Sequence, residues 1–497
     1  MWYLVALQKS RIDVGTPSTI TALSSTQKIQ QNHIKQFPQM TPFTMYRLPT
    51  LRNLATSINV HTRSPHRTKS TLSNAPAAQT FKVNSDRLWA DIHHTAQWSA
   101  PNATTKAGGL SRLSGTSEDQ KARDWFHEQI RSLGAAKYSI NATGSQFATF
   151  PGVDNSLPPI AMGSHLDSVA TGGRFDGPLG VIGALEVVRS LQEQRIQTFA
   201  PITLINWTNE EGARFFPPLG SSCVFAGQST VDAAHDSKAN NGSGETLGDA
   251  LRAIGYVGDG PNSFEEHPLS AHFEIHVEQA RALERAGKSV GWVEGWQGIS
   301  VFEVVFRGED GHANTYPMHG RRDSLVGASK LVVELDGLAY SAGGYTTATG
   351  IQSGPVGCCN IQSDTKLVFC VMHQELQGLE SMGDQILSKA KAIASAHGLD
   401  LEHSRLMHLE PGTFWEEAVD CVRRACGDKG IGARTDTAHD STMTQLKCPT
   451  AMVFARAKDG VSHAAHEWTD KEDCAESATV LGKSVLNFDQ ILRKRHS

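Results

Sequence analysis

The stretch that decides the fold is PPIAMGSHLDS (residues 158–168), together with LGVIGALEVVRSLQEQ (179–194) and PITLINWTNEE (201–211), which follow it. The first and third segments contain short apolar runs that predict buried strands, and the middle segment has the length and apolar content of a helix. Strands that alternate with helices indicate an α/β sheet. In such a sheet, functional groups gather at the strand ends and in the loops that follow them.

Both predicted strands run directly into side chains that can ligate a metal ion. His165 follows the first apolar run, and Glu210 and Glu211 follow the second. Three further stretches carry the same residue types: GGRFDG with Asp176, FEIHVEQ with His276, and GVSHAAHE with His463. Two bridged divalent cations about 3.5–4 Å apart can turn water into a nucleophile at neutral pH. The combination therefore predicts a dinuclear metal hydrolase.

Local context gives these groups different roles. Asp167 follows His165 by two residues, which would let this acid accept the second ring N–H and fix the tautomer of a ligating imidazole. Asp176 lies in a glycine-rich turn that allows close approach of the backbone, and its carboxylate could bridge both ions. Because Glu210 and Glu211 are adjacent, they point in different directions, so one can bind metal while the other acts as a proton shuttle.

Each signal has an ordinary explanation when it stands alone. A buried His bonded to an acid, an Asp in a turn and an exposed acidic pair are all common in proteins without metals. The acidic pair here, however, directly follows the apolar ITLINWT, where solvated charges are not expected. Five such signals in one chain favour the metal site over five separate coincidences.

The length and charge of the chain limit its number of domains and its possible partners. A chain of 497 residues is too long for one compact core and predicts two folded domains. Residues 1–84 hold ten Lys or Arg and a single acid, Asp13, whereas the rest of the chain has 36 basic against 50 acidic side chains. An acidic body argues against nucleic acid as a partner. No apolar run approaches the ~20 residues of a membrane span, so we expect no membrane partner either.

The basic leader, residues 1–83, is rich in Ser and Thr and almost free of acids. This is the composition of a mitochondrial presequence, and its densest part begins at Met45. The prediction is therefore a protein of the mitochondrial matrix. If the leader is a disordered extension, or if the chain starts at a later codon, the alternative is a cytoplasmic protein.

A second unit interrupts the hydrolase body. Between residues 300 and 398, two strand-like and two helix-like segments alternate, which fits a small α+β domain. We place this domain at 296–408, between the two parts of the catalytic domain at 84–295 and 409–497. The expected fold is α/β, with a mixed-sheet dinuclear-metal hydrolase domain and an inserted smaller α+β domain.

From about Asn84 to the C-terminus, the sequence resembles the metal-dependent amidases of the M20 group. The similarity is to their hydantoinase/carbamoylase branch, which includes N-carbamoyl-L-amino-acid hydrolases, yeast-type β-ureidopropionase and allantoate amidohydrolase. The motifs that carry it occur in the family's order: GSHLDS, GGRFDGPLGV, EEGARF, HVEQ, GHANTYPM with RRD, AHDS, and SH.

The resemblance implies a division of the ligands between two metal ions. His165 and His276 would bind one ion, Glu211 and His463 the other, and Asp176 would bridge them. The implied cofactor is a pair of divalent cations, with Zn²⁺ as the first expectation and Mn²⁺, Co²⁺ or Ni²⁺ as alternatives, because all of them occupy sites of imidazole and carboxylate.

The resemblance also implies roles outside the ligand set. Glu210 becomes the general base. The inserted domain becomes a lid that mediates formation of a homodimer, and its His312 reaches into the neighbouring subunit's site to stabilise the oxyanion. Gln279 and Asn360 match positions that hold the substrate, which would be a small ureido or amide compound.

The substrate pocket departs from the family pattern. His373 stands 13 residues after Asn360, where the family places an Arg that grips the substrate carboxylate. A neutral or partly charged imidazole cannot reproduce the two parallel hydrogen bonds of a guanidinium. Asn314 and Tyr316 also replace small residues. The metal centre therefore matches the family, while the pocket differs.

The leading functional expectation is hydrolysis of the C–N bond of an N-carbamoyl amino acid or related ureido compound, with activated water and Glu210 as base. One alternative is an M20-type dipeptidase or an N-acyl amino acid amidase. A second alternative is a non-catalytic dimeric relative that has lost substrate recognition through His373.

Overall fold

The computed structural model describes residues 78–497 except 79, 355–356 and 358, so nearly all of the predicted leader lies outside the described residues. Phe81, which falls within the predicted leader, is fully buried. Its ring covers Gly482, where a Cβ would approach to 2.1 Å. Asn84 caps the first helix of the body by accepting the N–H of Arg87. Among the described residues, no helix combines the length and apolarity needed to cross a membrane.

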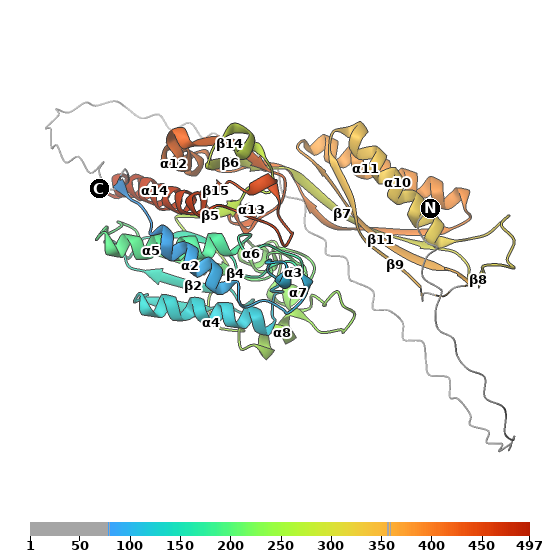
Figure 1. Cartoon of the computed structure of the whole chain (residues 1–497), viewed down its shortest axis with the longest axis horizontal. Helices are drawn as coiled ribbons and strands as arrows, with labels where there is room; N and C mark the ends of the chain where they lie inside the picture. The colour runs from blue at the N-terminus through green and yellow to red at the C-terminus, as the bar shows by residue number, and fades with distance from the viewer. Residues whose placement is uncertain (1–77, 79, 355–356, 358) are drawn as a thin grey trace, which may run out of the picture. The chain divides into compact units, whose positions relative to one another are not determined.

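A nine-stranded mixed sheet forms the body (Figure 1). Its strands are β1 (Lys137–Ile140), β2 (Gln146–Phe150), β3 (Ile160–His165), β4 (Ile202–Trp207), β5 (Ala271–Val277), β6 (Val290–Trp296), β13 (Gly412–Thr413), β14 (Gly430–Thr435) and β15 (Thr450–Ala455). The order is β1-β2-β4-β3-β5-β15-β6-β13, with β14 also paired to β6. The central strands β4, β3, β5 and β15 run parallel, so their carboxyl ends meet at one edge of the sheet.

Helices pack on this sheet around one large core. They are α2 (Ser85–Thr95), α3 (Ala103–Lys106), α4 (Ser117–Ser132), α5 (Pro178–Glu193), α6 (Gly220–Phe225), α7 (Val231–His235), α8 (Leu247–Ala253), α9 (Ala282–Ala286), α12 (Glu416–Cys426), α13 (Asp440–Thr444) and α14 (Lys471–His496). The helix α5 contacts β3, β5 and α14. Its Gly180 lets the helix approach the sheet, because a Cβ there would lie 2.5 Å from the carbonyl oxygen of Ile275. The α/β fold predicted from the sequence is confirmed.

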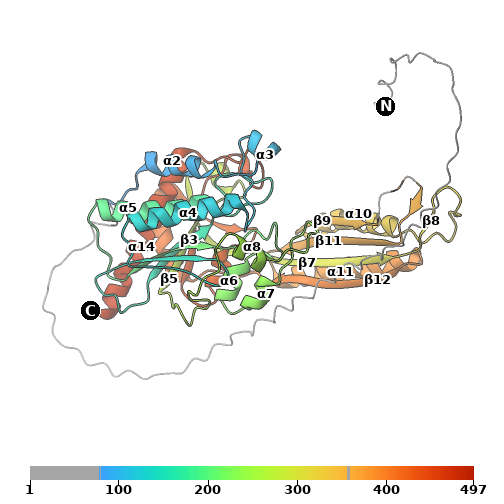
Figure 2. The same ribbon diagram turned by 90° about the horizontal axis from the view of Figure 1, so that it is seen from below.

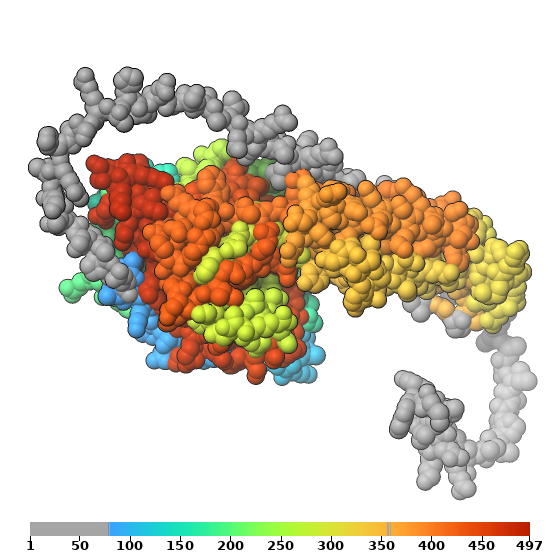
Figure 3. Space-filling model, turned by 90° about the horizontal axis from the view of Figure 1, so that it is seen from above, coloured from blue at the N-terminus to red at the C-terminus, as the bar shows by residue number. Residues whose placement is uncertain are grey.

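Residues 298–409 form the inserted domain, which has its own hydrophobic core. Its elements are β7 (Gly298–Arg307), β8 (Gly311–His312), α10 (Ser324–Ala342), β9 (Tyr345–Ser353), β10 (Asn360–Ile361), β11 (Asp364–His373), α11 (Leu376–Ala396) and β12 (Asp400–Leu409). Four strands form an antiparallel sheet in the order β12-β7-β11-β9, and β8 pairs with β10. The helix α10 contacts β9 and β11, and α11 contacts β7 and β12 (Figure 2). Figure 3 looks onto this helical layer, coloured yellow to orange.

The sequence predicts two of the four strands in this sheet, and it misses β9 and β12. Both lie at edges of the sheet. The side chains of β9 are exposed or half-buried along its whole length, and the first half of β12 is similar. An edge strand that buries neither face lacks the apolar alternation from which strands are recognised.

Candidate metal centre

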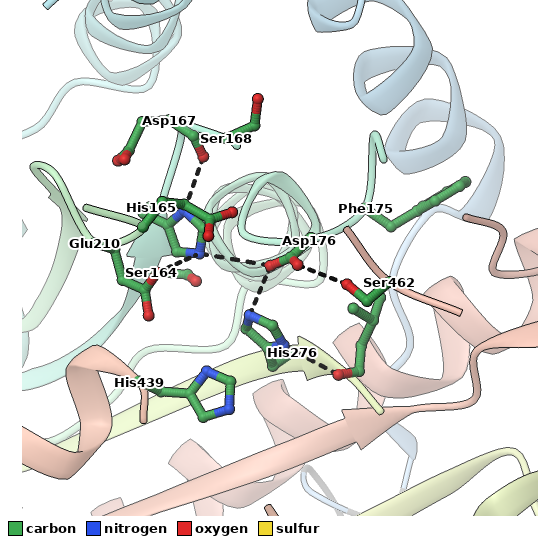
Figure 4. Close-up of polar contacts among 12 residues, drawn as sticks. Ser164, His165, Asp167, Ser168, Phe175, Asp176, Glu210, His276, His439 and Ser462 are labelled. Carbon is green, nitrogen blue, oxygen red and sulfur yellow. Dashed lines mark hydrogen bonds and ion pairs between the residues drawn. The ribbon is translucent and has the colours of Figure 1, made fainter. Parts of the chain in front are cut away.

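The structure brings together all five predicted metal ligands at the carboxyl edge of the central strands. Figure 4 shows three of them, His165, Asp176 and His276. They come from different elements: His165 ends β3, Asp176 precedes α5, Glu211 follows β4, His276 lies in β5, and His463 lies in the turn after β15. Gly177 has φ +79°, and a Cβ there would lie 2.3 Å from the ring of His165. The glycine after Asp176 is therefore required for the two ligands to approach.

The carboxylate of Asp176 lies at the centre of the cluster. Its Oδ1 is 3.0 Å from Nε2 of His276 and 3.7 Å from Nε2 of His165. Its Oδ2 is 3.3 Å from Nε2 of His463, which is itself 3.2 Å from Oε2 of Glu211. Two groups of potential ligands thus share this one carboxylate, and the donor atoms of each group lie within 4.8 Å of one another. The two groups contain the same residues that the family resemblance assigns to the two ions.

The chemistry of these residues fits a pair of divalent cations. Nε2 of His165 and Oε1 of Glu211 are buried and have no hydrogen-bond partner within the described residues. Buried polar atoms are normally satisfied, so two unpaired ligand atoms in this cluster of imidazoles and carboxylates are consistent with a bound cation as their partner. Imidazole nitrogens and carboxylate oxygens are the ligand types that Zn²⁺, Mn²⁺ and similar ions accept.

The pKa shifts of the clustered residues also indicate that the cluster favours positive charge at its centre. Burial opposes ionisation of Asp176, but the imidazoles of His276 and His463 outweigh it and hold the pKa of Asp176 well below its usual value. Burial likewise lowers the pKa of both histidines, yet the neighbouring carboxylates raise the pKa of His276 to about 9 and that of His463 to about 11. Without metal, protonated imidazoles supply the positive charge that bound cations would otherwise provide.

Glu210 lies inside the cluster but belongs to neither ligand group. Its Oε2 is 3.5 Å from Nε2 of His165, and the residue is 7% exposed. Burial raises the pKa of Glu210 well above its usual value, and the nearby carboxylates of Asp440 and Glu211 raise it further. A carboxylate with a raised pKa beside a metal site has the position and the proton affinity that a general base needs.

The predicted contact between His165 and the acid of Asp167 is wrong in its acceptor atom. Nδ1 of His165 lies 2.9 Å from the backbone carbonyl oxygen of Asp167 instead. The Asp167 carboxylate is buried, and one of its oxygens has no partner within the described residues. Burial raises the pKa of this acid to about 6. Residue spacing places Asp167 beside His165, but it cannot tell whether the backbone carbonyl or the side-chain carboxylate of Asp167 accepts the hydrogen bond. The backbone carbonyl still orients the ring.

The predicted substrate-binding residues, and His312 as the predicted oxyanion donor, fall into two places. Gln279 lies at the cluster, where its Nε2 donates to Oδ2 of Asp176 at 2.9 Å. His312, Asn360 and His373 lie in the inserted domain, and in the described part of the chain no hydrogen bond or ion pair joins them to the cluster. His373 ends β11, and its Nδ1 accepts the N–H of Glu375 at 2.9 Å.

The sequence does not predict three polar residues that surround the ligands. The ring of His439 is buried and lies 4.2 Å from the ring of His276. Ser462 and Glu467 are hydrogen-bonded around Asp176. His439 occurs in the family motif AHDS and Ser462 in the motif SH, whereas Glu467 lies outside both, and a lone Ser or Glu in a turn is normally solvated. The burial of His439 and Glu467, and the contact of Ser462 with Asp176, could not be inferred from residue types alone.

Comparison with known proteins defines the class. The pattern of the peptidase family M20/M25/M40 matches residues 161–487, which is more than half of the chain. An N-carbamoyl-L-amino acid amidohydrolase of Geobacillus stearothermophilus is 31% identical over 82% of this chain and 99% of its own length. An allantoate amidohydrolase of Escherichia coli is 24% identical over 78% of this chain and 95% of its own length.

A solved structure agrees with these relatives. An amidase of the hydantoinase/carbamoylase family from Burkholderia vietnamiensis superimposes with a TM-score of 0.78 at 33% identity, covering 82% of this chain and 98% of that one. The fold and site define a hydrolase, and the chain belongs to the M20/M25/M40 family. Its similarities lie in the hydantoinase/carbamoylase branch of that family, as the sequence motifs predict.

Proposed function

We propose that this protein is a metal-dependent amidohydrolase that cleaves a C–N bond of an N-carbamoyl amino acid or a related ureido compound. The observation that carries the proposal is the pair of ligand groups that share Asp176, with Glu210 beside them. The names of the relatives support this substrate class, because N-carbamoyl amino acids and allantoate both contain a ureido group.

The reaction follows from the positions of the side chains. Two bound divalent cations would lower the pKa of water and polarise the substrate carbonyl. Glu210 is near enough to the ligands to take the proton from the attacking water and to return it to the leaving amine. The cluster is buried except at His463, whose side chain is 52% exposed, so this imidazole marks the side that solvent reaches.

His312 is suited to stabilise the oxyanion. Its Nδ1 accepts the backbone N–H of Asn314 at 3.2 Å, so a neutral ring carries its proton on Nε2. The imidazole is exposed, and its Nε2–H is available to donate. Preorganised donors that point at developing negative charge supply a large share of catalysis in acyl transfer. Because the described chain gives His312 no contact with its own cluster, we assign it to the site of a second subunit.

The inserted domain carries a surface suited to a homodimer. Val326, Val333 and Tyr340 recur at seven-residue spacing on α10 and are 40%, 71% and 84% exposed. The neighbouring strand β9 is an edge of its sheet and exposes Tyr345 and Ile351. An exposed edge strand beside an apolar stripe can pair with its own copy about a twofold axis. We propose that two copies associate through this surface.

A substrate panel tests the proposed function. Chelator-treated protein is reloaded with Zn²⁺, Mn²⁺ or Co²⁺ and incubated with N-carbamoyl amino acids, allantoate, N-acetyl amino acids and dipeptides, and the products are separated by chromatography. We expect release of ammonia from ureido compounds. Preferential cleavage of N-acetyl amino acids or dipeptides would favour the peptidase or amidase alternative. No metal uptake, or no hydrolysis of any compound, would favour the non-catalytic alternative.

A further inference from the structure

Ser462 and Glu467 form a connected pair around the bridging carboxylate. Oε1 of Glu467 accepts the backbone N–H groups of Phe175 and Asp176, both at 3.0 Å. Oε2 of Glu467 lies 2.9 Å from the hydroxyl of Ser462, which donates to Oδ2 of Asp176 at 2.7 Å. The carboxylate of Glu467 therefore contacts the backbone of Asp176 directly. It reaches the side chain of Asp176 through the hydroxyl of Ser462. We call Ser462 and Glu467 the clamp.

The chain packs closely around Glu467, one of the two residues of the clamp. Glu467 is 3% exposed. Gly173 lies against it, and a Cβ at that glycine would approach Cδ of Glu467 to 2.2 Å. The loop GGRFDG is therefore closed around the carboxylate of Glu467, which comes from a segment almost 300 residues later in the chain. A buried acid whose one oxygen accepts two backbone N–H groups, and whose other oxygen lies against a hydroxyl, is fixed in one orientation.

The backbone at His463 lets the clamp and a ligand reach the same atom. Adjacent side chains in an extended chain point to opposite sides. His463 instead has φ +51°, a left-handed conformation that non-glycine residues rarely adopt. As a result Ser462 Oγ and His463 Nε2 both lie near Oδ2 of Asp176, at 2.7 and 3.3 Å. Strained backbone of this kind persists where surrounding contacts impose it, often at functional sites.

The two oxygens of Asp176 have different surroundings. Oδ1 faces His165 and His276, whose side chains are each 1% exposed. Oδ2 faces His463, which is half exposed, together with the hydroxyl of the clamp. Rigid strands hold the first ligand group, whereas a turn and the clamp hold the second. The second group therefore depends more on its hydrogen-bonded neighbours.

We propose that Ser462 and Glu467 are positioning residues that fix the bridging carboxylate of Asp176 and thereby set the affinity of the second ion, the one assigned to Glu211 and His463. This inference rests on the metal binding in the proposed function. Residues that orient metal ligands typically change metal affinity by 10- to 100-fold when they are removed. The clamp has that relationship to Asp176, and it leaves the strand-borne ligands His165 and His276 untouched.

Calorimetric titration of Zn²⁺ into the full chelator-treated protein tests the clamp without reference to catalysis. In Glu467→Ala we expect the second equivalent to bind at least ~10-fold more weakly than in the wild type, and the first equivalent to change much less. Glu467→Gln should recover most of the affinity, because its amide oxygen can accept the two backbone N–H groups while its NH₂ donates to Ser462. Glu472→Ala, which removes an exposed carboxylate at the start of α14, is the matched control.

Ser462→Ala keeps the test decisive if Glu467→Ala does not fold. It deletes only the hydroxyl, and we expect the second equivalent to weaken while the far-ultraviolet circular dichroism stays that of the wild type. Wild-type affinity for both equivalents in the folded clamp variants would overturn the proposal. Failure of the proposed function is distinguishable, because it would appear as a wild-type protein that binds no Zn²⁺ or that hydrolyses nothing.

Discussion

His312 and Asn360 are direct cross-strand partners in the two-stranded sheet of β8 and β10. The neighbouring backbone contact, from the N–H of Ala313 to the carbonyl of Cys359, is 2.7 Å long. Both partners are exposed. A predicted oxyanion donor and a predicted substrate-binding amide are thus held side by side on one small unit of the inserted domain, although 47 residues separate them in the chain.

This pairing predicts that His312→Ala is a catalytic defect that spares the metal centre. Loss of one oxyanion donor costs roughly 10²- to 10³-fold in kcat. Metal content, measured by atomic emission, should equal that of the wild type because His312 makes no contact with the ligands in the described residues. His403→Ala, at an exposed histidine of the same domain, is the control. Loss of bound metal from the His312 variant would contradict the assignment.

Co-expression of two inactive variants shows whether His312 acts in the partner's site. A mixed dimer contains one Glu210→Gln subunit and one His312→Ala subunit. If each site takes Glu210 from one subunit and His312 from the other, one of the two sites has both native residues and the other has neither. Random pairing then predicts recovery of about a quarter of wild-type activity. If His312 instead serves its own subunit, every site in the mixture lacks one group, and the mixture stays as inactive as its parents.

Glu210→Gln tests the proton shuttle itself. The substitution keeps size and hydrogen bonding but removes the basic oxygen, so turnover should fall at least ~10²-fold, within the usual contribution of a general base. Both metal equivalents should remain, since Glu210 belongs to neither ligand group. A near-normal rate with full metal content would exclude Glu210 from the mechanism.

His373→Arg asks whether the pocket still binds a carboxylate. A guanidinium can form two parallel hydrogen bonds with a carboxylate, which an imidazole cannot. We expect the KM for an N-carbamoyl amino acid to fall at least ~10-fold with little change in kcat, the signature of a contact equally strong in ground and transition states. An uncharged N-carbamoyl amine should show no change. His373→Lys is the control, because it adds positive charge without the two parallel hydrogen bonds of a guanidinium. Equal changes in KM for both substrates would show that residue 373 does not bind the substrate carboxylate.

A histidine outside the ligand set predicts how stability depends on pH. His272 on β5 is fully buried, and burial lowers its pKa from 6.5 to about 3. Between those values the unfolded chain binds a proton that the folded protein does not, so stability is lost as the pH falls below 6.5. From pH 6.5 to 5 this amounts to on the order of 2 kcal/mol.

Thermal melting of the metal-free protein at pH 7 and pH 5 measures this effect. The melting midpoint of the wild type should drop at the lower pH, and the drop should be smaller in His272→Asn, which has no proton to gain. His403→Asn, at an exposed position, should behave like the wild type. The same drop in all three proteins would show that His272 is not responsible.

The sequence predicted the fold best where one face or both faces of an element are buried. The strands that end at His165 and Trp207 are continuous apolar runs, and the structure buries every residue of both. The edge strands β9 and β12 were missed because all of β9 and the first half of β12 have exposed or half-buried side chains, so their pairing is set by neighbours rather than by their own pattern.

For the site, the sequence predicted which residues would gather but not how they bond. The metal-ligand residue types follow apolar strands, and parallel strands bring their carboxyl ends to one edge. The acceptor on Asp167 was wrong, because a carbonyl and a carboxylate of one residue are equivalent at the level of spacing. The contacts of Ser462 and Glu467 with the GGRFDG loop were not predictable, since these segments are far apart in the chain.

The sequence by itself determined the class of hydrolase and the set of polar residues at its centre, because apolar runs specify buried strands and each run leads into a group with metal-binding chemistry. Only the tertiary structure decided that Glu467 accepts the backbone N–H of Asp176 and that Ser462 donates to the Asp176 side chain. The physical reason is the distance along the chain over which each kind of interaction acts. Periodicity and strand propensity act over a few residues, whereas a hydrogen bond between residues 176 and 467 exists only after the sheet has formed.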